Sequence, residues 1–313
     1  MIRALRKIAR QLPYLRDIHA YVRALESERD ELRASVAHWK TWMSPGHFYS
    51  PIPNLDEVRS REASIWPPAP RHVAGIELNV DTQLATLREL ATFYRELPFP
   101  RTRVEGGPRY WFENHAYSFG DAIFLYSILR HVKPKRVIEV GSGFSSAVML
   151  DTRERFLGDD VQLTFIDPDV STLNALLRPG DRAEVIAARV QDVPLSRFDE
   201  LQAGDILFID STHVAKTGSD VNTILFDIVP RVAPGVLLHF HDIFWPFEYP
   251  KEWVYEGRAW NEDYLLRAFL MFNRDFEIVL FANYLGQFER EWLGREMPLV
   301  LENPGGNLWL RRK

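Results

Sequence analysis

The stretch Arg136–Leu150, RVIEVGSGFSSAVML, joins a short apolar run to a turn of glycine and serine and then to small residues. Glu139 interrupts the apolar run, and a buried carboxylate is costly unless other groups donate hydrogen bonds to it. Gly141 and Gly143 permit a sharp turn and let the backbone approach a ligand with no Cβ in the way. The pattern indicates a buried strand that turns into a helix. Glu139 would hold the amides of the turn or face a cationic ligand.

Short runs rich in valine, isoleucine, leucine and phenylalanine recur after this stretch, separated by helical patterns. Several runs are nearly continuous in apolar residues, as expected for strands buried on both faces. Strands that alternate with helices predict an α/β fold with a doubly wound, mostly parallel, seven-stranded sheet of the Rossmann type. The runs are RVIEVG, QLTFIDP, AEVIAARV, GDILFID, GVLLHFHD, FEIVLFANY and GGNLWLRRK, and we expect the last to pair antiparallel with FEIVLFANY.

The segments before the predicted sheet divide in two. Residues 1–43 form an N-terminal helical arm with a three-four spacing of apolar residues that Arg29 interrupts, which is typical of a coiled coil, a helical hairpin or a helix lying on its own domain. One expectation is that two copies of the chain form a homodimer through this arm. We expect residues 44–115 to form a proline-rich, extended connector followed by a helical cap, and residues 116–313 to form the domain that contains the predicted sheet. The apolar positions of the arm are Leu15, Ile18, Val22, Leu25, Leu32, Val36 and Trp39.

Composition narrows the class of protein. The 313 residues are 46% hydrophobic and 26% charged, as in ordinary globular proteins, and the net charge of -5 gives no general attraction to nucleic acid or anionic membranes. The absence of cysteine excludes disulfides, thiolate zinc sites and cysteine nucleophiles, and it fits the cytoplasmic location that we expect. No apolar run is long enough to predict a membrane span.

Acidic residues recur at the ends of the predicted strands. Because the carboxyl ends of parallel strands meet at one edge of a sheet, these carboxylates should lie near one another and near any ligand. Asp167 follows the second strand, where adenosine and dinucleotide sites place an acid on ribose hydroxyls. The nicotinamide fingerprint requires a third glycine, and Ser146 stands in its place. The strand-end acids are Asp167, Asp192, Asp210 and Asp242.

The combination of EVGSGFS, FIDPD, the QD after the third strand and LFID resembles class I S-adenosylmethionine-dependent methyltransferases, from about His131 onward. The segments GDILFIDSTH and GVLLHFHD are similar to a subgroup that contains metal-dependent sugar and natural-product O-methyltransferases and cephalosporin-hydroxylase-like proteins. The fourth-strand motif of that subgroup usually reads D-x-D-H. Here Asp210 is followed by Ser211, Thr212 and His213, so the second acid is absent.

The resemblance implies S-adenosylmethionine as cofactor and assigns residues to it. The glycine turn would border the methionine part, the acid of the second strand would accept the ribose hydroxyls, and the acid after the third strand would lie near the adenine. A solvated helix cap is the other interpretation of that last acid. The residues so assigned are Glu139, Gly141, Ser142, Gly143 and Ser145, then Asp167, Pro168 and Asp169, and finally Asp192.

The fourth and fifth predicted strands bring acids and histidines to the same edge, and we expect Asp210, His213, His241 and Asp242 to be catalytic. Oxygen and imidazole ligands suit Mg²⁺ or another divalent cation, with Asp210, His241 and Asp242 as its ligands. Alternatively, one of the histidines takes a proton from a substrate hydroxyl. His239 and His241 alternate along their strand, and we expect one of them to point into the fold.

Other segments flank the predicted site. Residues 243–264 are dense in aromatic side chains and form either a wall of the acceptor pocket or a packed aromatic cluster. Upstream, Tyr117 and Asp121 are expected near the cofactor, with a helix cap as the other interpretation of Asp121.

The predicted activity is methyl transfer from S-adenosylmethionine to an oxygen of a sugar or another hydroxylated small molecule, the acceptor class being an implication of the resemblance. The alternatives are a hydroxylase-like or NAD-dependent enzyme on the same fold and a non-catalytic interaction protein. The serine at position 146 argues against the NAD-dependent enzyme. The retained acids argue against a site that has lost its function.

Overall fold

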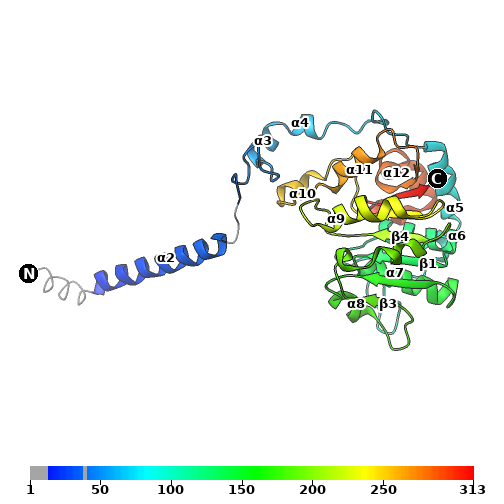
Figure 1. Cartoon of the computed structure of the whole chain (residues 1–313), viewed down its shortest axis with the longest axis horizontal. Coiled ribbons are helices and arrows are strands. Elements are labelled where there is room, and N and C mark those ends of the chain that lie inside the picture. The colour runs from blue at the N-terminus through cyan, green and yellow to red at the C-terminus, as the bar shows by residue number, and fades with distance from the viewer. Residues whose placement is uncertain (1–12, 38–40) are drawn as a thin grey trace, which may run out of the picture. The chain divides into compact units, whose positions relative to one another are not determined.

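The computed structural model describes residues 13–37 and 41–313, and the chain divides into two compact units at Arg59 and Ser60 (Figure 1). The first unit contains the helix α2 (Pro13–Ala37) of 25 residues, and every side chain from position 17 to 34 is exposed. The predicted arm is therefore helical over its described part. Residues 1–12 and 38–40, with Trp39, lie outside the described residues. No helix in the described ranges has the length and hydropathy that a membrane crossing requires.

The connector predicted to be extended contains two short helices, α3 (Leu55–Ser60) and α4 (Glu62–Ile65). The side chain of Asn54 caps α3, since its Oδ1 accepts hydrogen bonds from the backbone N–H groups of Asp56 at 3.0 Å and Glu57 at 3.3 Å. Both of those acids also lie in the first turn of the helix, where their negative charge interacts favourably with the positive end of the helix dipole. Local capping thus produces helix within a proline-rich segment.

The second unit is built on a seven-stranded sheet of order β3-β2-β1-β4-β5-β7-β6. Strands β1 to β5 are parallel, and β7 runs antiparallel to both of its neighbours. The predicted doubly wound sheet and the antiparallel pairing of β7 with β6 are confirmed, and β7 also pairs with β5. The strands are β1 (Arg136–Val140), β2 (Gln162–Ile166), β3 (Glu184–Ile186), β4 (Ile206–Ile209), β5 (Leu237–Phe240), β6 (Phe276–Phe281) and β7 (Leu308–Arg312).

Helices cover the sheet, and most follow the predicted pattern (Figure 1). They are α5 (Val80–Ala91), α6 (Gly120–Val132), α7 (Phe144–Thr152), α8 (Ser171–Leu176), α9 (Asp220–Thr223), α10 (Lys251–Tyr255), α11 (Glu262–Leu270), α12 (Ala282–Phe288) and α13 (Arg290–Glu296). The fold also contains short 3-10 helices, η1 (Tyr94–Glu96), η3 (Val190–Asp192), η4 (Leu195–Glu200), η6 (Val229–Arg231) and η7 (Pro298–Glu302). Two short π-helical segments are η2 (Arg153–Leu157) and η5 (Ile224–Ile228).

The apolar run FEIVLFANY, predicted to be strand throughout, changes structure at its end. Strand β6 stops at Phe281, and α12 begins at Ala282. Helices α12 and α13 span only 7 residues each, so neither contains enough turns to produce a clear helical period.

Strands β1, β4 and β5 form the buried centre of the sheet, with β4 and β5 buried along their whole length. This burial accounts for their continuous apolar sequences, since helices cover both faces of a parallel sheet. Helix α6 is buried from Gly120 to Leu129 and packs against α5 and α7. The buried centre fixes the carboxyl ends of β1, β2, β4 and β5, where the predicted functional residues lie.

Candidate functional site

A cavity of about 350 Å³ lies at the carboxyl ends of β1, β2 and β4. The predicted residues Gly141, Asp167, Pro168 and Asp210 contribute to its wall. The remaining wall is contributed by Val140, Ile166, Arg189, Val190, Gln191, Ser211, Thr212, Lys216, Gly218, Ser219 and Asp220. The strand-end edge of the sheet therefore holds a cavity where ligands bind in open α/β folds.

The glycines of the turn serve different purposes. Gly141 has φ +86°, and a Cβ at this position would lie 1.8 Å from the carbonyl oxygen of Asp210. The fold itself therefore requires glycine there. Gly143 has an extended backbone with φ 170°, and a Cβ there would meet only the Cγ2 of Thr172 at 3.7 Å. Chain packing does not require a glycine at position 143, which is consistent with the close approach of a ligand.

Glu139 is fully buried and holds the first turn of α7. Its carboxylate accepts hydrogen bonds at 2.5 Å from the hydroxyl groups of Ser145 and Ser146. The Oγ of Ser146 also accepts a hydrogen bond from the backbone N–H of Gly143 at 3.0 Å. Burial raises the pKa of Glu139 to about 8, although the hydroxyl hydrogen bonds oppose that rise. Glu139, Ser142, Gly143 and Ser145 are not among the residues that line the cavity.

Glu139 was predicted to hold the amides of the glycine turn, and Asp167 is the residue whose carboxylate contacts the turn backbone. Its carboxylate accepts hydrogen bonds from the backbone N–H groups of Ser142 at 2.7 Å and Asp169 at 2.8 Å, and so it holds the amides of the turn. Asp192 lies apart from the cavity wall and forms an exposed ion pair with Arg189, 2.9 Å from Nε to Oδ2. The chain beside Asp192, from Arg189 to Gln191, does line the cavity.

An acid and histidine cluster adjoins the cavity at the ends of β4 and β5. The Nε2 of His213 lies 3.4 Å from Oδ1 of Asp210 and 3.6 Å from Oδ2 of Asp242. Its Nδ1 lies 2.9 Å from Oε2 of Glu262, a residue of α11 that the sequence did not single out. The Nε2 of His241 lies 3.5 Å from Oδ1 of Asp242. The structure therefore brings together Asp210, His213, His241 and Asp242.

The backbone of the cluster is strained at two positions. His213 has φ +60° and Asp242 has φ +56°, a region that residues other than glycine rarely adopt. The carbonyl oxygen of His213 accepts hydrogen bonds from the N–H groups of Asn261 and Glu262, which fixes its turn. A Cβ on Gly306 would lie 2.8 Å from the Cα of Asp242, so the turn before β7 packs directly on this residue. Strain of this kind is concentrated at functional sites.

Burial and neighbouring charges act in opposite directions on the titration of the cluster. Burial alone would lower the pKa of His213, but hydrogen bonds with Asp210 and Glu262 outweigh it and raise that pKa well above its usual value. Burial would raise the pKa of Asp210, and the histidines bring it below its usual value. The pKa of Asp242 is raised, because its burial exceeds the attraction of both imidazoles. These directions describe a charged His213 beside an ionised Asp210.

His239 lies in β5 and His241 lies one residue beyond its end, and their ring centroids are 5.6 Å apart. His239 is fully buried and stacks on Phe208 at 3.9 Å, and burial lowers its pKa well below the usual value. It is the histidine that points into the fold. Burial would lower the pKa of His241, but Asp210 and Asp242 raise it.

Tyr117 and Asp121 reach the same cluster from the chain before β1. The ring of Tyr117 lies 5.0 Å from that of His241, and its hydroxyl donates to the carbonyl oxygen of Asp121. The Asp121 carboxylate accepts hydrogen bonds from the N–H of Gly306 at 3.2 Å and the side-chain amide of Asn307 at 2.7 Å. It fixes the turn before β7 instead of capping its own helix. Burial raises the pKa of Asp121 to about 7.

The aromatic segment 243–264 divides into a buried first half and a half-buried second half. Trp245, Phe247 and Tyr249 are buried in the fold. Trp260 is half-buried, and its ring lies 4.5 Å from that of His213. The neighbouring Trp253 is half-buried as well and lies under the guanidinium of Arg258 at 4.1 Å. The first half of the segment is core, and the second half is beside the cluster.

The described residues contain no group of three or more acidic, histidine or cysteine side chains arranged to hold a metal ion. The imidazole of His213 takes up the position between Asp210 and Asp242, with its Nε2 directed at both carboxylates. The predicted ligand set Asp210, His241 and Asp242 therefore does not fit a divalent cation in this arrangement.

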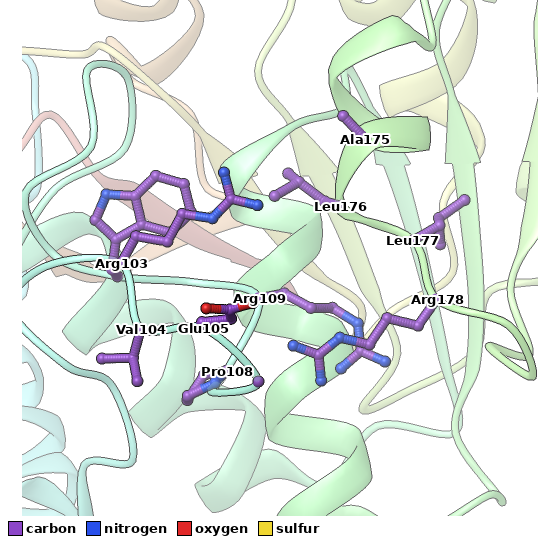
Figure 2. Close-up of a pocket in the computed structure, with 11 residues that line it drawn as sticks. Arg103, Val104, Glu105, Pro108, Arg109, Ala175, Leu176, Leu177 and Arg178 are labelled. Carbon is purple, nitrogen blue, oxygen red and sulfur yellow. The ribbon is translucent and has the colours of Figure 1, made fainter.

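A second cavity, of about 530 Å³, lies between the loop from Arg103 to Trp111 and the end of α8 (Figure 2). Arg109 donates to Asp151 at 2.8 Å and to Glu154 at 2.6 Å, and Arg178 donates to the carbonyl of Gly107. Both guanidinium groups already donate hydrogen bonds to carboxylates or a carbonyl. Arg109 and Arg178 therefore hold the loop in place and have little charge left to attract a ligand.

Comparison with known proteins adds an independent observation. Residues 138–243 match a family model described as a methyltransferase domain. An uncharacterized protein of Archaeoglobus fulgidus is 36% identical over 164 residues, which is 50% of this chain and 73% of that protein. The methyltransferase PaMTH1 of Podospora anserina, solved with S-adenosylhomocysteine, is 13% identical over 88% of this chain and 100% of its own, with a TM-score of 0.43. The O-methyltransferase TomG of Streptomyces achromogenes, solved with S-adenosylmethionine, is 14% identical over 82% and 95%, with a TM-score of 0.39.

Proposed function

The chain belongs to the class I S-adenosylmethionine-dependent methyltransferases, and on that premise we propose that it methylates an oxygen of a sugar or another hydroxylated small molecule. The observation that carries the proposal is the contact between the cavity and the acid and histidine cluster. Asp210 belongs to both, since it lines the cavity and lies 3.4 Å from His213. A bound cofactor and an acceptor would therefore meet at this residue.

In this proposal the cavity holds S-adenosylmethionine. Oδ2 of Asp167 accepts the backbone N–H of Ser142 and Oδ1 accepts that of Asp169, and in this proposal the remaining lone pairs accept the ribose hydroxyls. The glycine turn allows close approach at Gly143, and Arg189 to Gln191 form the wall at the far end. The sulfonium supplies an activated methyl group, so the protein mainly has to align the acceptor and remove its proton.

Asp242 is the residue that we assign as the base. Its raised pKa makes it a stronger proton acceptor than Asp210, whose pKa is lowered. Its side chain is 17% exposed, compared with 5% for His213 and 4% for His241. A hydroxyl group therefore reaches Asp242 more readily than it reaches either imidazole. The histidines act behind the carboxylate as positioning residues that stabilise its charge.

The surroundings of Asp242 also favour the acceptor class. Asp121, Glu262 and Asp263 are buried around it, and burial raises the pKa of each carboxyl group, so these groups are held toward their neutral form and suit an uncharged acceptor. The half-buried rings of Trp253 and Trp260 offer apolar faces beside hydrogen-bonding groups. A neutral polyhydroxylated molecule such as a sugar matches this combination. We derive no step through a divalent cation, because the predicted ligands do not fit one.

Two substitutions test the proposal. We expect Asp167→Ala to weaken S-adenosylmethionine binding in calorimetry by at least about tenfold, the loss of a charge-assisted hydrogen bond. We expect Asp242→Asn to keep cofactor affinity and to lose transfer of a labelled methyl group into a panel of sugars and phenols. Asp159→Asn is the matched control, since its carboxylate lies in an exposed ion pair with Arg182, and neither residue lines the cavity. Tight binding of NADH with no response to S-adenosylmethionine would refute the assignment, as would full turnover by Asp242→Asn.

A further inference from the structure

The helix α2 carries an apolar seam on an otherwise charged surface. Ile18, Val22, Leu25 and Leu32 are 41%, 43%, 46% and 59% exposed, and all side chains from 17 to 34 are exposed. A helix of 25 residues is about 37 Å long. Helices whose apolar stripe stays in water are only marginally stable by themselves. We therefore expect the apolar seam to be buried against another surface.

The charges of α2 weaken the isolated helix further. Arg29 and Arg33 lie four residues apart, as do Glu26 and Asp30, and like charges at this spacing repel each other on one helix face. Arg29 is relieved in part by Asp30, 2.8 Å away. Opposite charges three residues apart, Glu26 with Arg29 and Asp30 with Arg33, offset this repulsion in part, but Glu28 has no basic residue three or four positions away on the helix.

We propose that α2 forms a parallel, in-register, two-stranded coiled coil with α2 of a second copy of this chain. The apolar spacing is a continuous heptad in which Val22 and Arg29 occupy a positions and Leu25 and Leu32 occupy d positions. A β-branched residue at a with leucine at d favours two parallel strands over three or four. Val22, Leu25 and Leu32 follow this pattern, whereas Ile18 places a β-branched residue at a d position.

Charge complementarity selects a second copy as the occupant. In the heptad that the seam defines, Glu28 is a g residue, and Arg33 is the e residue of the next heptad. In a parallel dimer, Glu28 of each copy lies opposite Arg33 of the partner subunit. It also flanks the partner's Arg29, whose charge would otherwise remain in the seam. Every copy supplies both members of these pairs, so the helix is complementary to itself.

The same residues disfavour other arrangements. A shift of one heptad would set Arg29 against the partner's Val22, burying a cation on an apolar side chain. In an antiparallel pair, g residues face g residues, and Tyr21, Glu28 and Ser35 include no basic residue. Arg29 is a polar residue at a single a position, the feature that fixes register in parallel dimers.

Cross-linking in the full-length chain tests the proposal directly, because the chain contains no cysteine. With Leu25→Cys, a parallel in-register dimer brings each new thiol against its counterpart, and we expect rapid formation of a disulfide dimer under mild oxidation. Ser27→Cys is the control, since this f position faces away from the seam. Equal rates for the two variants, or cross-linking only at Ser27→Cys, would overturn the proposal.

Mass in solution provides a second measurement that is independent of methyl transfer. We expect the native chain to have twice its 36.4 kDa mass at micromolar concentration. Glu28→Arg should raise the dissociation constant of the dimer by about tenfold or more, because it reverses attraction on both sides of the seam. Glu31→Arg makes the same charge change at an outward c position and should leave the constant nearly unchanged. A monomeric native chain, or equal effects of the two variants, would overturn the proposal, whatever the outcome for the cofactor.

Discussion

Glu139 and Asp167 are acids of neighbouring strands with different tasks. Glu139 is sealed behind the glycine turn and bonded to the hydroxyls of Ser145 and Ser146, whereas Asp167 lies in the cavity wall. A buried acid that keeps its proton stabilises a helix start without placing a charge in the fold. The residue that most resembles a ligand contact in sequence is therefore a support for the loop.

The titration of Glu139 gives a prediction about stability. Its pKa of about 8 in the fold exceeds the ordinary value of 4.5, so the folded chain holds a proton that the unfolded chain has released. The associated stabilisation is therefore lost progressively between about pH 4.5 and 8, and the loss is complete above the folded pKa. Between about pH 5 and 8, we expect the melting temperature of the native chain to fall relative to that of Glu139→Gln, which cannot ionise.

Differential scanning fluorimetry without cofactor measures this difference. Glu291→Gln serves as control, since its side chain is 92% exposed and its substitution should give a difference that does not change with pH. A constant difference between native chain and Glu139→Gln across this range would contradict the assigned environment of Glu139.

The two glycines of the turn give a matched pair of substitutions. Gly141→Ala forces a Cβ onto the carbonyl of Asp210 at a φ of +86°, and we expect a loss of about 2–4 kcal/mol of unfolding free energy. Gly143→Ala meets only Thr172 at 3.7 Å and should leave stability within about 1 kcal/mol. If the cofactor approaches Gly143, that second variant should bind S-adenosylmethionine more weakly while melting normally. Urea unfolding and calorimetry separate the two effects.

Among the secondary-structure elements, the loop before α6 depends on one buried ion pair network. Arg109 is 6% exposed and joins this loop to Asp151 of α7, itself 2% exposed. Trp111 of the same loop contacts Phe144 at the start of α7, with ring centroids 5.0 Å apart. The network thus fixes the loop against the helix that begins at the glycine turn.

Removing the cation from this network should be costly. We expect Arg109→Met to lower the free energy of unfolding by about 3–5 kcal/mol, because it leaves a buried carboxylate without its partner. The double variant Arg109→Met/Asp151→Asn should recover part of this loss, since the amide oxygen still accepts the N–H of Tyr110. Urea denaturation measures both. Equal stability of the single and double variants would show that the Asp151 charge is not the cause.

Features set by local sequence patterns could be predicted from the sequence, whereas contacts between residues far apart in the chain could not. The strands β1 to β7 could be predicted because each is a short apolar run with a local signal. The proximity of the residues that follow β4 and β5 could be predicted because parallel strands end at the same edge of a sheet. Helices α12 and α13 were missed because each has too few turns for a period. The bond between His213 and Glu262 joins residues 49 apart in the chain, and no local pattern marks Glu262. The edge of the sheet that holds the cavity could be predicted from sequence, but the bonding within the acid and histidine cluster could not.

At the scale of the whole molecule, the division at Arg59 and Ser60 leads to a further prediction. The sheet and every candidate site residue lie in residues 60–313, and α3, which spans the boundary, has no buried residue. We expect a chain of residues 60–313 to bind S-adenosylmethionine with unchanged affinity and to melt within about 2 °C of the full chain. Calorimetry and thermal melts compare the two. A tenfold loss of affinity would show that the first unit contributes to the site.

The position of β7 also affects the order in which the molecule is completed. β6 is synthesised before β7 but joins the sheet only through it, since β7 lies between β5 and β6. Until β7 emerges from the ribosome, β6 has no strand to pair with, and its unpaired backbone invites association with other chains. The turn before β7 also supplies the groups that hold Asp121 and pack on Asp242. A nascent chain therefore completes the packing around Asp121 and Asp242 only when this late strand is made.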